Sequence, residues 1–496
     1  MEKTLIFRSV DEIRLKKLLR FIIPTYLTSL FTTVYTIVDG IFVSAYVGTN
    51  ALAAINVVYP LVNILYGIAL AFATGGSALA ALHIGGKKND KASRTFSVSM
   101  TAAIVIGALV SALILFRLPL ILQMLGATSL LMEDCKAYIY WWLFGAPIVV
   151  GKEMFTYFIR VDGSPTYSFL TALSGGIFNI VFDYIFIGQL HMGITGAALA
   201  TFLGLLLSFI MGVVYFVTHP NFLHFTFRGL SIKEAFHSMI NGTSEFVNQL
   251  AIAITTVVFN RSALLFAGED GVAAVSIIMY LQFLCIGIYF GFSMGLSTPL
   301  GYAYGDRNLS VCRVLEKYAY RFFAIAPIIL YGCTYLLAPI GVRFFASPGS
   351  TVFDMAVSGL RLYGLGFLFS GINIFAAIRM MTYGKGYISG MITFLRSFAL
   401  LLLFLTVWEL FADFHIIDSF FFSSPSRVVA CFVRMVSERS LFTHIGITLT
   451  ETVISFFLVA LVSLSAATLL WYSRRLSEIL EPFLVVLNSL PKSALA

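Results

Sequence analysis

The chain has 496 residues, of which 59% are hydrophobic and 11% are charged, and its mean hydropathy is +0.93. This composition excludes a water-soluble globular protein and predicts an all-α polytopic membrane protein surrounded by a lipid bilayer. A net charge of +8 would suggest nucleic-acid binding in a soluble protein, but here the basic residues lie in loops between apolar segments. We therefore expect no nucleic-acid partner.

Apolar segments follow one another along the chain, and each is long enough to cross a bilayer as a helix. They predict about twelve membrane spans. The predicted spans lie near residues 21–45, 51–82, 96–120, 136–160, 166–189, 193–218, 237–266, 270–302, 319–341, 356–383, 387–411 and 446–472.

Basic residues gather in the segments that these spans would leave on one side of the membrane. The side with more Lys and Arg is the cytoplasmic side, so this distribution predicts a cytoplasmic N-terminus and a multi-pass protein of the plasma (inner) membrane. The residues concerned are Arg14, Lys16, Lys17, Arg20, Lys87, Lys88, Lys91, Arg94, Arg228, Lys233, Arg307, Arg313, Lys317, Arg321, Arg379 and Lys385.

The sequence contains an internal repeat. Gly48–Val58 reads again at Gly268–Ile278, 220 positions later, and the same offset pairs Gly75 with Gly295 and Gly85 with Gly305. An offset kept over so many positions predicts two structurally related halves. The first half holds six spans, so both halves start on the same side and should be related by an axis along the membrane normal. The glycines are expected to permit close helix packing.

The repeat predicts four parts of the chain. Residues 1–218 form an N-terminal six-helix lobe, and residues 219–236 form a cytoplasmic connecting loop. Residues 237–403 form an incomplete C-terminal lobe, and residues 404–496 continue without matching the repeat.

Asp39 is a carboxylate inside the apolar run from Phe21 to Tyr46. A charge at the centre of a membrane span costs roughly 2.5–3.5 kcal/mol on insertion scales, so such a residue is expected to face water, a partner or a proton. Asn179 and Asp183 in the fifth predicted span are four residues apart and therefore share one helical face. These three side chains could together hold a proton or a sodium ion.

Several motifs of the chain resemble those of the multidrug and toxic compound extrusion (MATE) family, in the same order. The resemblance covers residues 15–400 and is carried by VDG at 38–40, VGTNALAA at 47–54, GGSALAALHIGGKKND at 75–90, FNIVFDYIFI at 178–187, MGITGAALAT at 192–201 and GLSTPLGYAYGDRN at 295–308.

This resemblance implies a cation-coupled antiporter of two six-helix bundles that exports small organic cations or amphiphiles in exchange for protons or sodium ions. Asp39, Asn179 and Asp183 match the family's coupling residues. Glu245 resembles an acidic residue of the second lobe in some members, and Asn373 stands in a span where some members carry an acid. The resemblance implies no cofactor other than the coupling ion.

The last part of the chain, residues 405–496, resembles an N-terminal fragment of an ABC importer permease of the nitrate, sulfonate and taurine type. The matching residues are WELF at 408–411, SSPSRVV at 423–429, LFTHIGITL at 441–449 and NSLPKSALA at 488–496. A foreign segment would then replace the last helix of the second lobe. The loop by which such permeases engage an ATPase does not follow, so we expect no ATPase partner.

Other polar residues favour no catalytic site. The five cysteines show no metal-binding spacing, and no Walker, HExxH or Ser-His-Asp pattern stands out, so we expect neither an enzyme nor a metal site. Lys152 and Glu153 are neighbours within a span and are expected to pair with other helices. Arg160, Arg379 and Arg396 are expected to be anchors that reach the membrane surface.

Three alternatives remain open at this stage. The first is a lipid-linked oligosaccharide flippase of the same superfamily, which an acidic cavity disfavours. The second is an ABC importer permease subunit, and the third is a non-functional hybrid.

Overall fold

The computed structural model describes residues 15–125, 127, 129, 131–226 and 231–399, together with Phe7, residues 9–10, Ile13 and scattered positions between 406 and 434. Regular structure in these ranges is helical. The first half contains α1 (Leu15–Tyr46), α2 (Thr49–Gly85), α3 (Asn89–Phe116), α4 (Leu118–Met124), α5 (Met132–Phe144), α6 (Ala146–Val161), α7 (Pro165–Asp183), the π-helical turn Tyr184–Gln189 and α8 (Gly193–Thr218).

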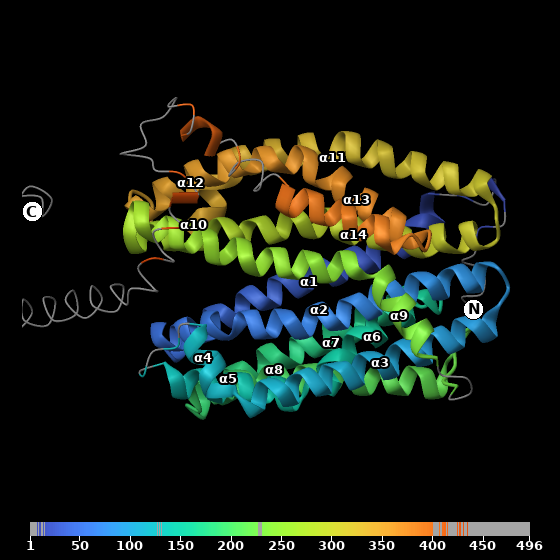
Figure 1. The fold of residues 1–496 in the computed structure, drawn as a ribbon, viewed down its shortest axis with the longest axis horizontal. Coiled ribbons are helices and arrows are strands. Elements are labelled where there is room, and N and C mark those ends of the chain that lie inside the picture. Colours follow the sequence, from blue (N-terminus) through green and yellow to red (C-terminus); the bar gives the residue numbers. More distant parts are fainter. Residues whose placement is uncertain are drawn as a thin grey trace, which may run out of the picture. The chain divides into compact units, whose positions relative to one another are not determined.

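The second half is also helical within the described residues. It contains α9 (Ile232–Asn241), α10 (Thr243–Gly305), α11 (Leu309–Arg343), α12 (Thr351–Tyr363), the 3-10 turn Gly364–Gly366, α13 (Phe367–Thr382), α14 (Gly386–Phe394) and the π-helical turn Leu395–Ala399. Figure 1 shows α2–α8 grouped apart from α11–α14, and the two halves meet where α10 packs on α1 and α2.

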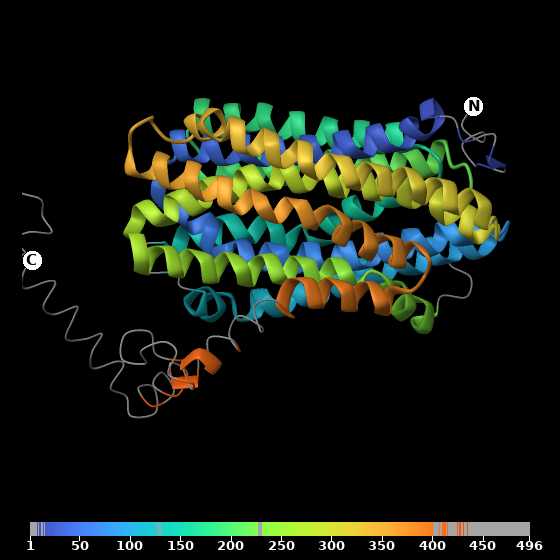
Figure 2. The same cartoon turned by 90° about the horizontal axis from the view of Figure 1, so that it is seen from above.

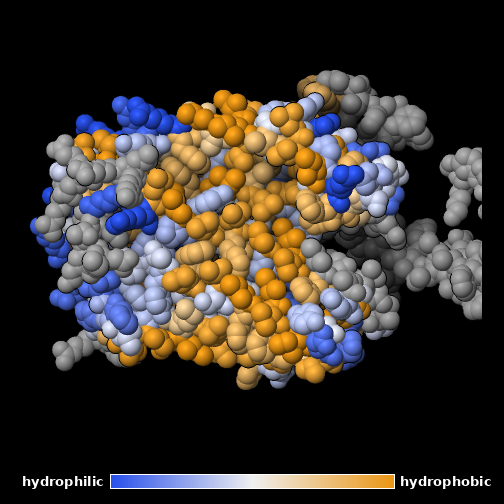
Figure 3. All heavy atoms as spheres, turned by 180° about the vertical axis from the view of Figure 1, so that it is seen from behind, coloured by the Kyte–Doolittle hydropathy of each residue, from blue (hydrophilic) through white to orange (hydrophobic). Residues whose placement is uncertain are grey.

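The surface is that of a membrane protein. Eight helices within the described ranges are long and apolar enough to cross a membrane. Figure 3 shows a broad hydrophobic band across the middle of one face, with hydrophilic residues gathered toward the ends. Large apolar side chains such as Leu113 and Leu336 are 70% and 73% exposed, which is favourable only where the surroundings are lipid. The prediction of an all-α membrane protein is therefore confirmed.

The internal repeat appears in the structure as reciprocal contacts between glycines and the other half. A Cβ atom added at Gly85 would lie 2.1 Å from the Tyr302 carbonyl oxygen, and one added at Gly305 would lie 2.1 Å from the Leu82 carbonyl oxygen. Gly305 and Tyr302 are the repeat mates of Gly85 and Leu82, so the same contact is made twice. These glycines let the backbones of α2 and α10 touch, as expected.

The two predicted spans 237–266 and 270–302 form one continuous helical element, α10, of 63 residues. A straight helix of this length would extend about 95 Å. However, Gly242, just before α10, lies against Ala71 of α2, and Gly305 at its far end lies against Leu82 of the same helix. α10 must therefore turn back on itself, as Figure 2 shows at the edge of the molecule. Both predicted segments are helical, and helical structure continues through the turn between them, but of the two only Ala273–Gly305 is a candidate membrane span within the described ranges.

Other element boundaries also differ from the prediction. The span expected at 136–160 is two helices, because Gly145 ends α5 and Pro147 lies in the first turn of α6, a position that favours a helix start. The span at 356–383 is interrupted by the turn Gly364–Gly366. The connecting loop expected at 219–236 becomes helical at Ile232, where α9 begins.

The chain divides into two compact units, Met1–Leu400 and Leu401–Ala496. In the second unit the Glu409 carboxylate accepts a hydrogen bond from the Ser426 backbone N–H at 2.8 Å. The predicted span at 446–472 lies outside the described residues, as does almost all of the segment 404–496.

Candidate functional site

The structure brings Asp39 and Asp183 together, although they are far apart in the sequence. Asp39 lies on α1 and Asp183 at the end of α7, and these two helices pack against each other. The two carboxyl groups are close enough for the charge of one to act on the other. Asp183 is fully buried and Asp39 is half-buried. Two carboxylates in such a place repel each other unless a proton or a cation lies between them.

Asn179 joins this pair one turn earlier on α7. Its Nδ2 donates to Thr201 Oγ1 on α8 at 3.4 Å, and its side chain lies on the same face of α7 as Asp183. α7 and α8 approach closely at two glycines, since a Cβ atom added at Gly204 would lie only 2.5 Å from the Gly175 carbonyl oxygen. The absence of a side chain at Gly204 permits this approach. Thr201 was not among the predicted site residues. Thr201 is the last residue of the motif MGITGAALAT at 192–201, and this position in a family motif was the only feature of the sequence that pointed to it.

The oxygens of this cluster are short of hydrogen-bond donors. Within the described residues, Asp39 Oδ1, Asn179 Oδ1 and both carboxyl oxygens of Asp183 are buried and have no hydrogen-bond partner. Carboxylate and amide oxygens are the ligands that hard cations prefer, and a shared proton would equally satisfy two facing carboxyl groups. No group of three or more His, Cys, Asp or Glu side chains that could hold a metal ion occurs in the described part of the chain.

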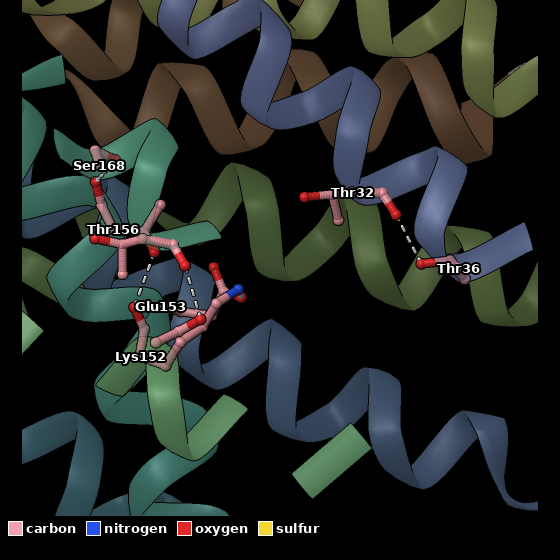
Figure 4. A network of polar contacts seen from close by, with 8 residues as sticks. Thr32, Thr36, Lys152, Glu153, Thr156 and Ser168 are labelled. Carbon is pink, nitrogen blue, oxygen red and sulfur yellow. Dashed lines mark hydrogen bonds and ion pairs between the residues drawn. The ribbon is translucent and has the colours of Figure 1, made fainter. Parts of the chain in front are cut away.

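A second polar group lies on α6 in the same half. Lys152 Nζ and Glu153 Oε1 form an ion pair of 2.6 Å, and both side chains are almost fully buried. Thr156 donates to the Lys152 carbonyl oxygen at 3.0 Å, and Ser168 on α7 donates to the Thr156 carbonyl oxygen at 2.7 Å. Figure 4 shows this network and, apart from it, the hydrogen bond from Thr36 to the Thr32 carbonyl oxygen within α1.

The pairing of Lys152 with Glu153 corrects the prediction that they pair with other helices. Adjacent helical residues leave the backbone in different directions, but the long lysine side chain bends back to its neighbour. Tyr35, one turn before Asp39 on α1, lies near enough to both members of the ion pair and to Asp39 for their charges to act on its hydroxyl group. The ion pair therefore belongs to the surroundings of the carboxylate site.

Glu245 and Asn373 are not joined in the second half. Glu245, on α10, is buried and interacts electrostatically with Arg396. Arg396 Nη2 also donates to Asn248 Oδ1 at 2.9 Å. Asn373 is half-buried on α13 and makes no hydrogen bond within the described residues. The positive charge of Arg396 thus offsets the negative charge of Glu245, which was the one carboxylate predicted for a second ion site.

The prediction that the three arginines are surface anchors is wrong for Arg160, which is buried, while Arg379 and Arg396 are partly exposed and also have partners in the protein. Arg396 points toward Asn248 on α10. Arg160 is buried, with its guanidinium 4.8 Å from the centre of the Tyr157 ring. Arg379 forms an ion pair with Glu316. Each arginine is held by partners inside the protein, because a buried guanidinium needs such partners.

A family model named MatE matches residues 24–185 and again residues 245–407. The two matches together cover more than half of the chain and fall one in each half of the internal repeat. The chain belongs to the MatE family. Its match ends at residue 407, close to the end of the first compact unit.

Two curated relatives show which MatE proteins the chain is similar to. The multidrug export protein MepA of Staphylococcus saprophyticus is 24% identical over 364 residues, which cover 72% of this chain and 80% of that protein. MepA of Staphylococcus aureus is 22% identical over 368 residues, with the same shares covered.

Solved MatE structures share the fold. A crystal structure of MATE in complex with MaL6 superposes with a TM-score of 0.74 at 24% identity and covers 79% of this chain and 88% of that one. An outward-facing multidrug resistance MATE family transporter superposes with a TM-score of 0.73 at 24% identity, over 79% and 87% of the two chains. These superpositions confirm the two-lobe fold.

Proposed function

We propose that this chain is a multidrug efflux antiporter that exports cationic amphiphiles in exchange for protons or sodium ions. The observation that carries the proposal is the pair of neighbouring carboxyl groups, Asp39 and Asp183, of which Asp39 Oδ1 and both oxygens of Asp183 are buried and have no hydrogen-bond partner within the described residues. Membership of the MatE family and similarity to proteins named multidrug export protein support the same function.

The pair can couple the two fluxes because it has two charge states. With a proton or sodium ion bound, the repulsion between Asp39 and Asp183 is relieved, and α1 and α7 can pack closely. After its release, the site is negative and attracts an organic cation. If the two states favour different facings of the first lobe, each ligand shifts the equilibrium by its differential affinity, and exchange follows.

The contacts between the halves suggest how the lobes move. The reciprocal glycine contacts at Gly85 and Gly305 hold α2 and α10 together at one end. Lobes that touch closely at one end can rock about that contact and open a central cavity to either side in turn. By the distribution of basic residues, we place this end, and the N-terminus, on the cytoplasmic side of the plasma (inner) membrane.

The alternatives receive less support. A lipid-linked oligosaccharide flippase would need to bind an anionic substrate, and the cluster of Asp39 and Asp183 is acidic. The MatE match ends at residue 407 and so says nothing about the rest of the chain. The likeness of residues 405–496 to an ABC importer permease is not supported by the comparisons and stays a prediction. No enzymatic activity and no ATPase partner are proposed.

The experiment is ethidium efflux from cells that express the chain, beside Asp39→Asn at equal membrane level. We expect the variant to lose efflux, because an amide cannot exchange a proton. Asp354→Asn is the matched control, since Asp354 is exposed on α12. Efflux in Asp39→Asn equal to that in the unchanged chain would contradict the proposal. No efflux from any version would favour the non-functional hybrid or a different substrate.

A further inference from the structure

The first turns of α11 carry a shallow groove on the surface of the second lobe. Its volume is about 410 Å³. The residues that line it are Arg313, Glu316, Lys317, Tyr320, Arg321 and Ala324. All of them lie on one helix, at positions that recur every three or four residues from Arg313 to Ala324 (i, i+3, i+4, i+7, i+8 and i+11), so they form one face of α11. This groove has no part in the coupling site described above.

The groove is basic. Arg313, Lys317 and Arg321 are four residues apart, exposed, and without an ion pair within the described residues. Glu316, the acid of the groove, is already paired with Arg379 of α13. Three positive charges on one face therefore lack a counter-charge, and the groove is suited to an anion.

The same face of α11 continues as an apolar strip. Tyr320 lies at the end of the basic part, and beyond it Ile328 is exposed one turn after Ala324, with Ile325 exposed at the flank of the same face. α11 is itself a candidate membrane span, so this strip faces the hydrocarbon of the bilayer. From Arg313 to Ile328 the helix rises about 22 Å, which is comparable to an extended acyl chain below its headgroup.

We propose that this face of α11 binds an anionic phospholipid of the phosphatidylglycerol class. The phosphate lies among the three basic side chains, and an acyl chain follows the isoleucines. Tyr320 stands at the level of the headgroup, where aromatic side chains with a polar tip are favoured. A free phosphate would use only the basic part of the face, whereas a lipid uses all of it.

The test measures lipid binding by the purified full-length chain in detergent, by native mass spectrometry and by the rise in melting temperature. Phosphatidylglycerol is compared with phosphatidylcholine and with inorganic phosphate. The test variant is Arg313→Gln/Lys317→Gln/Arg321→Gln. The control variant Lys88→Gln/Lys91→Gln/Lys233→Gln removes the same charge from other exposed positions.

We expect phosphatidylglycerol to bind the unchanged chain and the control variant more tightly than phosphatidylcholine. A membrane-surface base contributes roughly a fivefold change in affinity, so the triple variant should bind on the order of 100-fold more weakly. Arg313→Lys/Arg321→Lys keeps the charge and should keep most of the binding, which separates charge loss from misfolding.

Three results would overturn the proposal. One is equal loss of binding in the test and control variants, which would indicate a general charge effect. Another is inorganic phosphate that competes fully with the lipid, which would indicate a simple anion site. The third is equal affinity for phosphatidylglycerol and phosphatidylcholine.

Discussion

The neighbouring side chains of Lys152 and Glu153 form an ion pair inside the first half, close to the carboxylate site. Neither side chain is more than 11% exposed. Removing one member of a buried ion pair leaves an uncompensated charge, whereas replacing both by neutral residues is often well tolerated. The ion pair therefore affects the stability of the fold, and this effect can be measured by unfolding, without a transport assay.

We predict that Lys152→Met lowers the free energy of unfolding by about 3–5 kcal/mol, because Glu153 loses its counter-charge. Lys152→Met/Glu153→Gln should recover most of the loss. The melting temperature of the purified chain in detergent measures both. A double variant as unstable as the single one would contradict this role for the pair.

At the carboxylate site, single residues were predictable where their cost was visible in the sequence. Asp39 and Asp183 are charges in apolar spans, and Asn179 shares the face of Asp183. Thr201 was missed because a threonine costs little in a membrane helix, and its position beside Asn179 depends on the packing of α7 on α8. The partners of Arg396 and Arg160 inside the protein were not predicted for a related reason, since the sequence does not show which way a long side chain turns.

At the scale of helices, close packing of α2 on α10 depends on glycine. The positions of Gly85 and Gly305 leave no room for a Cβ atom, because the facing carbonyl oxygen would lie 2.1 Å away. Any side chain there forces the two helices apart. By contrast, a Cβ at Gly332 of α11 would meet nothing within 4 Å.

We predict that Gly305→Ala destabilises the protein by about 1–3 kcal/mol through this overpacking. Gly332→Ala is the matched control and should be neutral or stabilising by about 0.5–1 kcal/mol, since alanine favours a helix. Thermal unfolding in detergent compares them. Equal shifts for the two variants would show that the tight contact has no energetic importance.

Helix existence was predictable from hydrophobicity, but helix interruption was not. The sequence predicted the two passes of α10, yet gave no reason for helical structure to continue through the turn between them. Gly145 and Pro147 were present as signals for the break between α5 and α6, but they lie inside an otherwise uninterrupted apolar run. The internal repeat was the strongest signal of the two-lobe fold. Its paired glycines Gly85 and Gly305 lie where the two halves contact each other.

At the scale of the whole molecule, the connection between the halves is tied to the first lobe. The Asp162 carboxylate accepts hydrogen bonds from the backbone N–H groups of Asn221 at 2.8 Å and of Phe222 and Leu223 at 2.7 Å. Asp162 is fully buried where α6 ends. One side chain thus fixes the start of the segment that links the two lobes.

We predict that Asp162→Ala releases this segment, because each N–H group left without an acceptor costs about 1–3 kcal/mol while it stays buried. Limited proteolysis within residues 219–226 should become faster than in the unchanged chain. Asp162→Asn keeps one acceptor oxygen and should give an intermediate rate. Unchanged proteolysis in Asp162→Ala would contradict this role.

The account as a whole depends on Asp39 and Asp183 acting as one coupling unit. The most direct measurement is ethidium transport into proteoliposomes driven by an imposed proton or sodium gradient, for the unchanged chain, Asp39→Asn, Asp183→Asn and the double variant. We predict that each single change abolishes driven transport and that the double change is no worse, because residues that act as a unit are not additive. Driven transport that persists in the double variant would contradict the account.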